Sequence, residues 1–114
     1  MTFDELARAH CSPRKGKEHA LTSVEIRSGL DMLESWKLSE DGKGISKQFR
    51  FDNFHRTMAF VNAVAWIAHV EDHHPDMKVS YPSCELYFST HDVGGLSLND
   101  LICAARVDHL LDHA

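Results

Sequence analysis

The stretch from residue 53 to residue 72 constrains the fold of this 114-residue chain more than any other. It is helix-length and carries apolar residues at helical spacing on two faces, with Asp52 as its expected N-cap. We expect one face to lie on the core, namely Phe54, Met58, Val61, Ala65 and Ala68. So small a domain has little interior left for the other face, Phe60, Val64 and Ile67, which predicts a subunit interface, or else a covering loop.

Four short stretches on either side of this helix have the alternation and residue types of β-strands. They lie at residues 36–38, 45–51, 78–81 and 84–90. The first two are joined by a polar, glycine-containing turn at residues 39–44. Pro82 interrupts the last two, which is typical of an edge strand or a bend.

Two further helices are marked by capping boxes, Thr22 with Glu25 and Ser97 with Asp100. The order is helix, two strands, long helix, two strands, helix. This order predicts an α+β fold with a four-stranded antiparallel sheet and three helices packed on one face. We expect one domain at residues 21–114, preceded at residues 1–20 by an extension with a short helix and a linker.

The charge distribution indicates which classes of molecule the protein is suited to bind. A net charge of −5 with neutral histidines argues against direct nucleic-acid binding, which needs a basic face. One tight basic cluster, Arg14, Lys15 and Lys17, sits between Pro13 and Glu18. We interpret it as a solvated linker rather than a binding patch.

The cysteines and the apolar runs indicate in which cellular compartment the protein is expected. The three cysteines, Cys11, Cys84 and Cys103, form no disulfide framework and no Cys-x-x-Cys pair, which predicts a reducing cytoplasm. The most apolar run, residues 58–68, is too short to span a membrane, and residues 1–10 lack the pattern of a signal peptide.

A histidine pair follows the long helix, and a third histidine lies farther along the chain, at His91. His73 and His74 precede Pro75, which ends helices, so the pair is expected at a helix end. Imidazole exchanges protons near neutrality and also binds metals. The three rings therefore predict either a metal centre or metal-free proton transfer at one site.

His69 and His73 are also spaced as in zinc sites, four residues apart on a helix. The metalloprotease pattern requires a glutamate directly after the first histidine, and Val70 stands there instead. A surface histidine pair without a role is the alternative to a metal site.

These residues carry a family resemblance. The ordered set resembles the signature of the pterin-4a-carbinolamine dehydratases: Glu71-Asp72-His73-His74-Pro75-Asp76, Tyr81, Thr90-His91, Gly95-Leu96-Ser97 and Asp100. Trp36, residues 47–51 and Phe54 are similar to that family as well, so the likeness covers roughly residues 22 to 110.

The resemblance implies an enzyme that dehydrates 4a-hydroxytetrahydrobiopterin to quinonoid dihydropterin and so recycles the cofactor of aromatic amino-acid hydroxylases. The reaction needs an acid for the leaving oxygen and a base for the proton on N5, and it requires no cofactor or metal. The family's histidines correspond to His73, His74 and His91. We assign His73 and His91 as the acid/base pair, in either order, and His74 to substrate binding and charge stabilisation.

The resemblance also suggests supporting residues. Pro75, Asp76 and Tyr81 are expected to shape the site. Trp36 is either a flat wall for the pterin or an ordinary core aromatic, and Asp100 is expected to cap its helix, to orient His91, or both.

One position departs from the family. Many members carry a carboxylate four residues before the first histidine of the pair, where this chain has His69. His69 cannot act as an anion, so the group that polarises His73 is left open.

The resemblance implies a homodimer or homotetramer, which we expect to form through the 53–72 helix and strand edges. Two alternatives remain open: a regulator with the same fold that binds a transcription factor as a dimerisation partner, and a pterin-related role in molybdenum cofactor metabolism. The three histidines favour the enzyme, because a protein that only binds a partner has no need of them.

Overall fold

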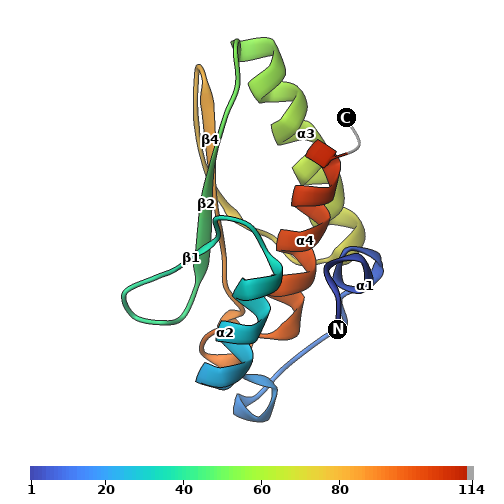
Figure 1. The fold of residues 1–114 in the computed structure, drawn as a ribbon, viewed down its shortest axis with the longest axis vertical. Coiled ribbons are helices and arrows are strands. Elements are labelled where there is room, and N and C mark those ends of the chain that lie inside the picture. Colours follow the sequence, from blue (N-terminus) through green and yellow to red (C-terminus); the bar gives the residue numbers. More distant parts are fainter. Residues whose placement is uncertain (113–114) are drawn as a thin grey trace.

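The computed structural model describes residues 1–112. Its elements along the chain are α1 (Phe3–Arg8), the 3-10 helix η1 (Lys17–His19), α2 (Ser23–Met32), β1 (Lys37–Leu38), β2 (Ile45–Arg50), α3 (Phe54–Glu71), β3 (Asp76–Ser80), β4 (Ser83–Phe88), the 3-10 helix η2 (His91–Val93) and α4 (Leu98–Asp112). Figure 1 shows the sheet nearly edge-on, with the helices gathered on one side of it. The predicted α+β fold is confirmed, and the described residues include four α-helices because α1 joins the expected three.

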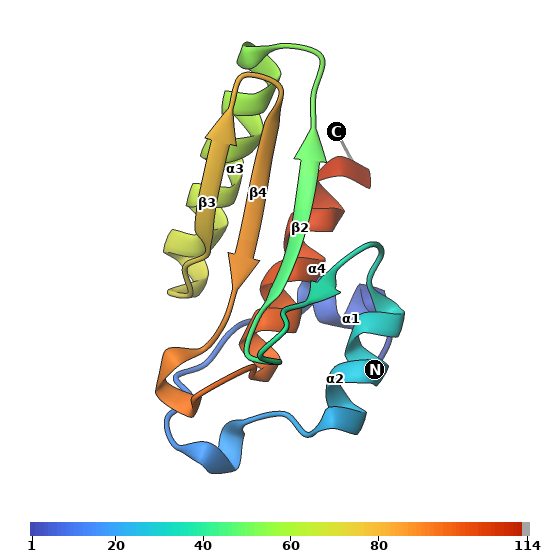
Figure 2. The same cartoon turned by 90° about the vertical axis from the view of Figure 1, so that its left-hand side faces the viewer.

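The sheet is antiparallel throughout, with strand order β1-β2-β4-β3. β3 and β4 form a hairpin in which Asp76 pairs with Tyr87 and Ser80 with Ser83. Pro82 therefore lies in the turn beside an edge strand, as its chemistry predicts. The start of β3 and the end of β4 lie at the same end of the sheet (Figure 2), which brings the segments on either side of the hairpin toward each other.

Local hydrogen bonds explain where the helices begin. Thr2 and Thr22 both form complete capping boxes, each with the glutamate three residues on, as that spacing predicts. The expected cap of α3 is wrong by one residue. Asn53, not Asp52, has the extended backbone of an N-cap, and its side-chain oxygen accepts from the backbone N–H of Arg56 at 2.9 Å.

The prediction for the two faces of α3 is largely wrong, although Ala68 is buried as expected. Phe54 and Ala65, expected on the core side, are exposed. The buried stripe consists of Thr57, Phe60, Val64, Ala68 and Glu71. Both faces are apolar, so only the position of the neighbouring β4 and α4 decides which one is covered. The outer face exposes Phe54, Trp66 and Val70. The interface was expected on Phe60, Val64 and Ile67, but Phe60 and Val64 are buried within the chain, so a subunit interface elsewhere on this helix stays a prediction.

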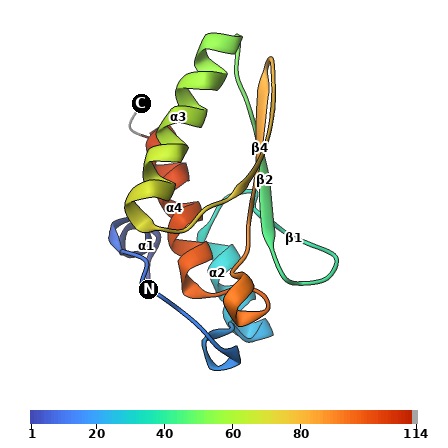
Figure 3. The same ribbon diagram turned by 180° about the vertical axis from the view of Figure 1, so that it is seen from behind.

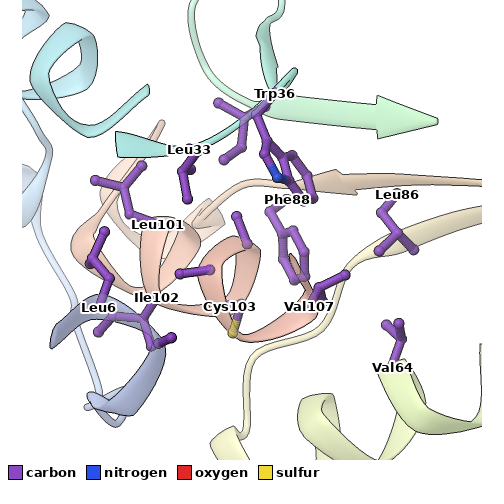
Figure 4. Packing of buried hydrophobic residues seen from close by; sticks show 14 of the residues in the cluster. Leu6, Leu33, Trp36, Val64, Leu86, Phe88, Leu101, Ile102, Cys103 and Val107 are labelled. Carbon is purple, nitrogen blue, oxygen red and sulfur yellow. The ribbon is translucent and has the colours of Figure 1, made fainter. Parts of the chain in front are cut away.

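α4 is the centre of the core. It lies between the sheet and α1, as the views from the front and from behind agree (Figures 1 and 3). Figure 4 shows Ile102 and Cys103 of α4 between Leu6 of α1 and Phe88 of the sheet, with Val107 of α4 beside Phe88. Leu6 is completely buried, so the N-terminal extension contributes to the same core.

Trp36 belongs to this core. It is 6% exposed and packs against the rings of Phe49 and Phe88. Its indole N–H donates to Oδ2 of Asp108 at 3.0 Å, and Lys47 bonds the other oxygen of that carboxylate at 2.9 Å. Trp36 is therefore the core aromatic of the two alternatives, and it does not form a wall for a flat ligand.

None of the helices within residues 1–112 combines the length and the apolar character that crossing a membrane requires.

Candidate active site

His73 stands just beyond the end of α3. Asp72 ends the helix in a left-handed conformation (φ 51°, ψ 44°), and the chain then turns away from the helix axis. The ring of His73 stacks on Phe88 with 6.1 Å between centroids and 9° between planes. Its Nε2 lies 2.6 Å from Oδ1 of Asp100. The helix end and the core ring thus hold the imidazole in one orientation.

Asp100 is buried completely, so its carboxylate depends on donors from the protein. Oδ2 accepts from the hydroxyl of Thr90 at 2.6 Å and from the backbone N–H of Ser97 at 2.9 Å. Thr90 Oγ1 also lies 2.7 Å from Ser97 Oγ. These bonds turn Oδ1 toward His73.

The sequence left open whether Asp100 caps its helix or orients a histidine. It does both, but the histidine is His73 and not His91. Asp100 also supplies a carboxylate to His73, the role left open by the histidine at position 69. A carboxylate oxygen accepts hydrogen bonds, so the tautomer of His73 that fits this contact has its proton on Nε2 and leaves Nδ1 as an acceptor.

A cleft of about 400 Å³ borders His73 and Thr90, the two side chains that contact the carboxylate of Asp100. Its volume falls in the range of small-molecule sites. His73 and Thr90 lie on one side, and residues 11–15 of the N-terminal segment form another. Sequence reasoning missed this wall. Its signal was the basic cluster that includes Arg14, which we interpreted as a solvated linker.

Glu71 is a second buried carboxylate at this cleft, with a side chain only 2% exposed. Burial alone would raise its pKa. The backbone N–H of Cys11, the His10 ring and the charge of Arg106 outweigh burial, so the pKa of Glu71 lies below its ordinary value. Glu71 is therefore held as an anion beside the cleft.

The other two histidines of the predicted site do not line this cleft. His91 opens η2, is exposed, and borders a neighbouring hollow of about 300 Å³ together with Tyr87 and Ser89. Thr90 lines both hollows. His74 is exposed in the connection between α3 and β3. The structure thus brings His73 to Asp100 and leaves His74 and His91 at the same end of the sheet, outside the cleft lining.

The remaining predicted residues are more distant or exposed. Tyr81 is 62% exposed in the β3–β4 turn, at the far end of the hairpin from His73, and stacks on Phe54, so it cannot shape this cleft. Pro75 is half-buried and Asp76 exposed at the start of β3.

His69 is exposed on α3 against the ring of Trp66. It does not share a helical face with His73, because α3 ends at Glu71. Within residues 1–112 there is no group of three or more His, Cys, Asp or Glu side chains placed to hold a metal ion.

Solved structures share this architecture. A transcriptional coactivator/pterin dehydratase from Brucella melitensis superposes with a TM-score of 0.76 at 26% identity, over 79% of this chain and 96% of that one. A pterin dehydratase-like protein identified as a RuBisCO assembly factor in the alpha-carboxysome shares the fold with a TM-score of 0.59 at 24% identity, over 68% of this chain and 89% of that one. The fold is that of the pterin dehydratases.

The sequence comparisons are more specific. The family model for pterin 4 alpha carbinolamine dehydratase matches residues 19–110. A protein of Xanthomonas campestris pv. campestris (strain 8004) named for this dehydratase is 53% identical over 107 residues, which is 94% of this chain and 91% of the relative. A Stenotrophomonas maltophilia (strain K279a) protein with the same name is also 53% identical, covering 94% and 92%. The chain belongs to the pterin-4a-carbinolamine dehydratase family and is an enzyme of the hydro-lyase class.

Proposed function

We propose that this chain dehydrates 4a-hydroxytetrahydrobiopterin to quinonoid dihydropterin, with His73 as the base, and thereby recycles the cofactor of aromatic amino-acid hydroxylases. The observation that carries the proposal is the 2.6 Å contact between His73 and the buried Asp100 at the edge of a cleft. The carboxylate orients the imidazole and favours its protonated form after it has accepted a proton.

The chemistry needs two proton movements. Nδ1 of His73 takes the proton from N5 of the pterin, and the electron pair of that N–H bond forms a double bond between N5 and C4a. The C4a–O bond breaks, and the leaving hydroxyl takes up a proton and departs as water. Each positioned donor or acceptor is worth about 10²- to 10⁴-fold.

His91 is the proposed acid, and His74 the proposed group for substrate binding and charge stabilisation. Two facts support a place for His91 at the reaction. It follows Thr90, which bonds Asp100 and lines the cleft, and its exposure allows exchange of protons with solvent. Nothing in this dehydration requires a redox centre or a metal.

The test is the dehydration rate of freshly generated carbinolamine. We expect the wild-type protein to accelerate the reaction and His73→Ala to lower kcat by about 10²- to 10⁴-fold while the protein stays folded. His91→Ala should also lower kcat, whereas His69→Ala, which changes an exposed histidine outside the cleft, should not. Wild-type protein no faster than buffer would contradict the proposal.

A protein-binding role is the second candidate. The Brucella melitensis neighbour is described as a transcriptional coactivator as well as a pterin dehydratase. The outer face of α3 in this chain exposes Trp66 at 66% and Val70 at 53%, an apolar surface of the kind that partner proteins cover. A folded wild-type chain without dehydratase activity would favour this role.

A further inference from the structure

The cleft at His73 has a wall that comes from the N-terminus. Residues 11–15 run between α1 and η1 and line the same cleft as His73. The family model begins to match only at residue 19, so this wall lies outside the part of the chain that the model describes.

One anchor of the wall is Asn99, which is 5% exposed and directly precedes Asp100. Its Oδ1 accepts from the backbone N–H of Ser12 at 3.2 Å and from Nε of Arg14 at 3.0 Å. Its Nδ2 donates to the carbonyl of Ser12 at 2.8 Å. Both ends of this buried amide are therefore used to hold the segment.

The other anchor is Glu71, two residues before His73 in the chain. Its Oε1 accepts from the backbone N–H of Cys11 at 2.7 Å, and its Oε2 lies 2.9 Å from Nδ1 of His10. Arg106 stands 3.8 Å from the same oxygen and donates to the carbonyl of Ala9. The wall is thus held by Asn99, which adjoins Asp100 in the chain, and by Glu71, which lies two residues before His73. These bonds fix its position relative to His73 and Asp100.

Arg14 is the side chain of the wall best suited to hold a ligand. Its bond to Asn99 uses Nε and leaves the two terminal nitrogens, with four N–H groups, outside that bond. Because the Nε bond orients the guanidinium, less conformational freedom is lost when the terminal nitrogens bind an acceptor. Arg14 is half-buried and lines the cleft, so these donors border the space where a substrate would sit.

The pterin offers matching acceptors beside its reacting edge. In the 4a-carbinolamine, the carbonyl oxygen on C4 is next to C4a, and the substituent on C6 is next to N5. A substrate whose N5 faces His73 therefore carries an oxygen on either flank of the reacting bond. The exposed carboxylates of Asp72 and Asp92, which also line the cleft, suit the N–H groups of the ring instead.

We propose that Arg14 is a substrate-binding residue whose guanidinium donates to an acceptor oxygen next to the reacting C4a–N5 edge, either the C4 carbonyl or a hydroxyl of the C6 side chain. This inference rests on the proposed function. It assigns the N-terminal segment to the active site and makes Arg14 a determinant of substrate affinity.

The experiment compares Arg14→Gln and Arg14→Lys with Lys17→Gln. Lys17 belongs to the same basic cluster but is exposed in η1 and does not line the cleft, so it is the matched control. Two substrates are used, the carbinolamines of tetrahydrobiopterin and of 6-methyltetrahydropterin, which lacks the side-chain hydroxyls. Unfolding in urea verifies that each variant is folded.

We expect Arg14→Gln to raise KM about tenfold or more, since a hydrogen bond from a charged donor is lost. Arg14→Lys should show a smaller rise, Lys17→Gln none, and kcat should stay within about twofold for all three. An equal rise for both substrates assigns the C4 carbonyl, and a rise confined to the biopterin substrate assigns the side-chain hydroxyl. Binding of 7,8-dihydrobiopterin, followed by fluorescence, should weaken by the same factor.

An unchanged KM in Arg14→Gln overturns the inference while the wild-type activity stands. A fall in kcat together with lowered stability and unchanged KM overturns it too, because Arg14 would then only support the wall. Inactive wild-type protein overturns the proposed function and this inference with it.

Discussion

Two buried carboxylates on α4, Asp100 and Asp108, differ in their partners. Asp108 is bonded by the indole N–H of Trp36 and by the ammonium group of Lys47. Asp100 is bonded by a hydroxyl, a backbone N–H and the imidazole of His73. Both carboxylates are buried, Asp100 completely and Asp108 with 8% exposed, so burial alone does not distinguish the two sites.

The distinction lies in what each partner can do near neutral pH. The ammonium group of Lys47 bonds Asp108 at 2.9 Å, and the ordinary pKa of a lysine lies far above neutrality, unlike that of an imidazole. Burial raises the pKa of Asp108, and the bonds from Lys47 and Trp36 oppose that rise. An imidazole can gain and lose a proton near neutrality, which is what the proposed dehydration requires of the partner of Asp100. The same residue type on one helix is thus structural at one end and suited to catalysis at the other.

The largest expected effect is that of Asp100→Asn on turnover. The amide cannot stabilise the imidazolium by charge, so we expect kcat for carbinolamine dehydration to fall about 10²-fold or more. Steady-state kinetics on protein shown to be folded by circular dichroism measures this. A variant with wild-type kcat would remove the contrast between the two carboxylates.

Asp108→Ala should lower the free energy of unfolding and leave kcat unchanged. It leaves Lys47 and the indole N–H of Trp36 without their acceptor, and removing one partner of a buried pair costs about 3 kcal/mol. Urea unfolding gives the free energy, and kcat per folded molecule should match wild type. If kcat instead falls as in Asp100→Asn, the division into a structural and a catalytic carboxylate is wrong.

The smallest effect concerns Glu71, the carboxylate that anchors the N-terminal wall. Its pKa is lowered in the folded protein, so the unfolded chain takes up the proton at a higher pH than the fold does. The stabilisation is fully present above the unfolded pKa, about 4.3, and is lost as the pH falls through the lower folded value.

Glu71→Gln should therefore lower the free energy of unfolding at pH 7 by about 1–2 kcal/mol and weaken its decline in acid. Urea unfolding at pH 7 and at pH values below 4.3 measures both changes. Glu40→Gln, an exposed residue of the β1–β2 turn, is the control and should leave the profile unchanged. If the free energy of unfolding of Glu71→Gln fell with pH in parallel with that of wild type, this carboxylate would contribute nothing to stability in acid.

Local features of the fold were readable from the sequence. The capping box at Thr22 forms completely, and at Ser97 the backbone N–H donates to Asp100 three positions on while the Ser97 hydroxyl accepts from the backbone N–H of Asn99. The alternation of residues 84–90 puts Cys84, Leu86 and Phe88 on one face of β4, and the structure buries all three. Such patterns can be predicted from the sequence because the residues that interact lie within one helical turn or one strand of each other.

Longer-range features were not readable. Both faces of α3 are apolar, so choosing the buried one required knowing what packs on it. Trp36 fitted two roles until its indole was found on Asp108. Arg14 resembled a solvated linker residue because its partner, Asn99, lies near the other end of the chain.

The sequence by itself determined the family, the order of helices and strands, and the residues from which a proton-transfer site could be built. Tertiary structure alone decided that Asp100 bonds His73 rather than His91, and that the N-terminal segment closes one side of the cleft. The physical reason is that a cap or a strand alternation is formed by neighbours in the chain. The partner of a buried carboxylate is whichever donor the packing of distant segments brings within hydrogen-bonding distance.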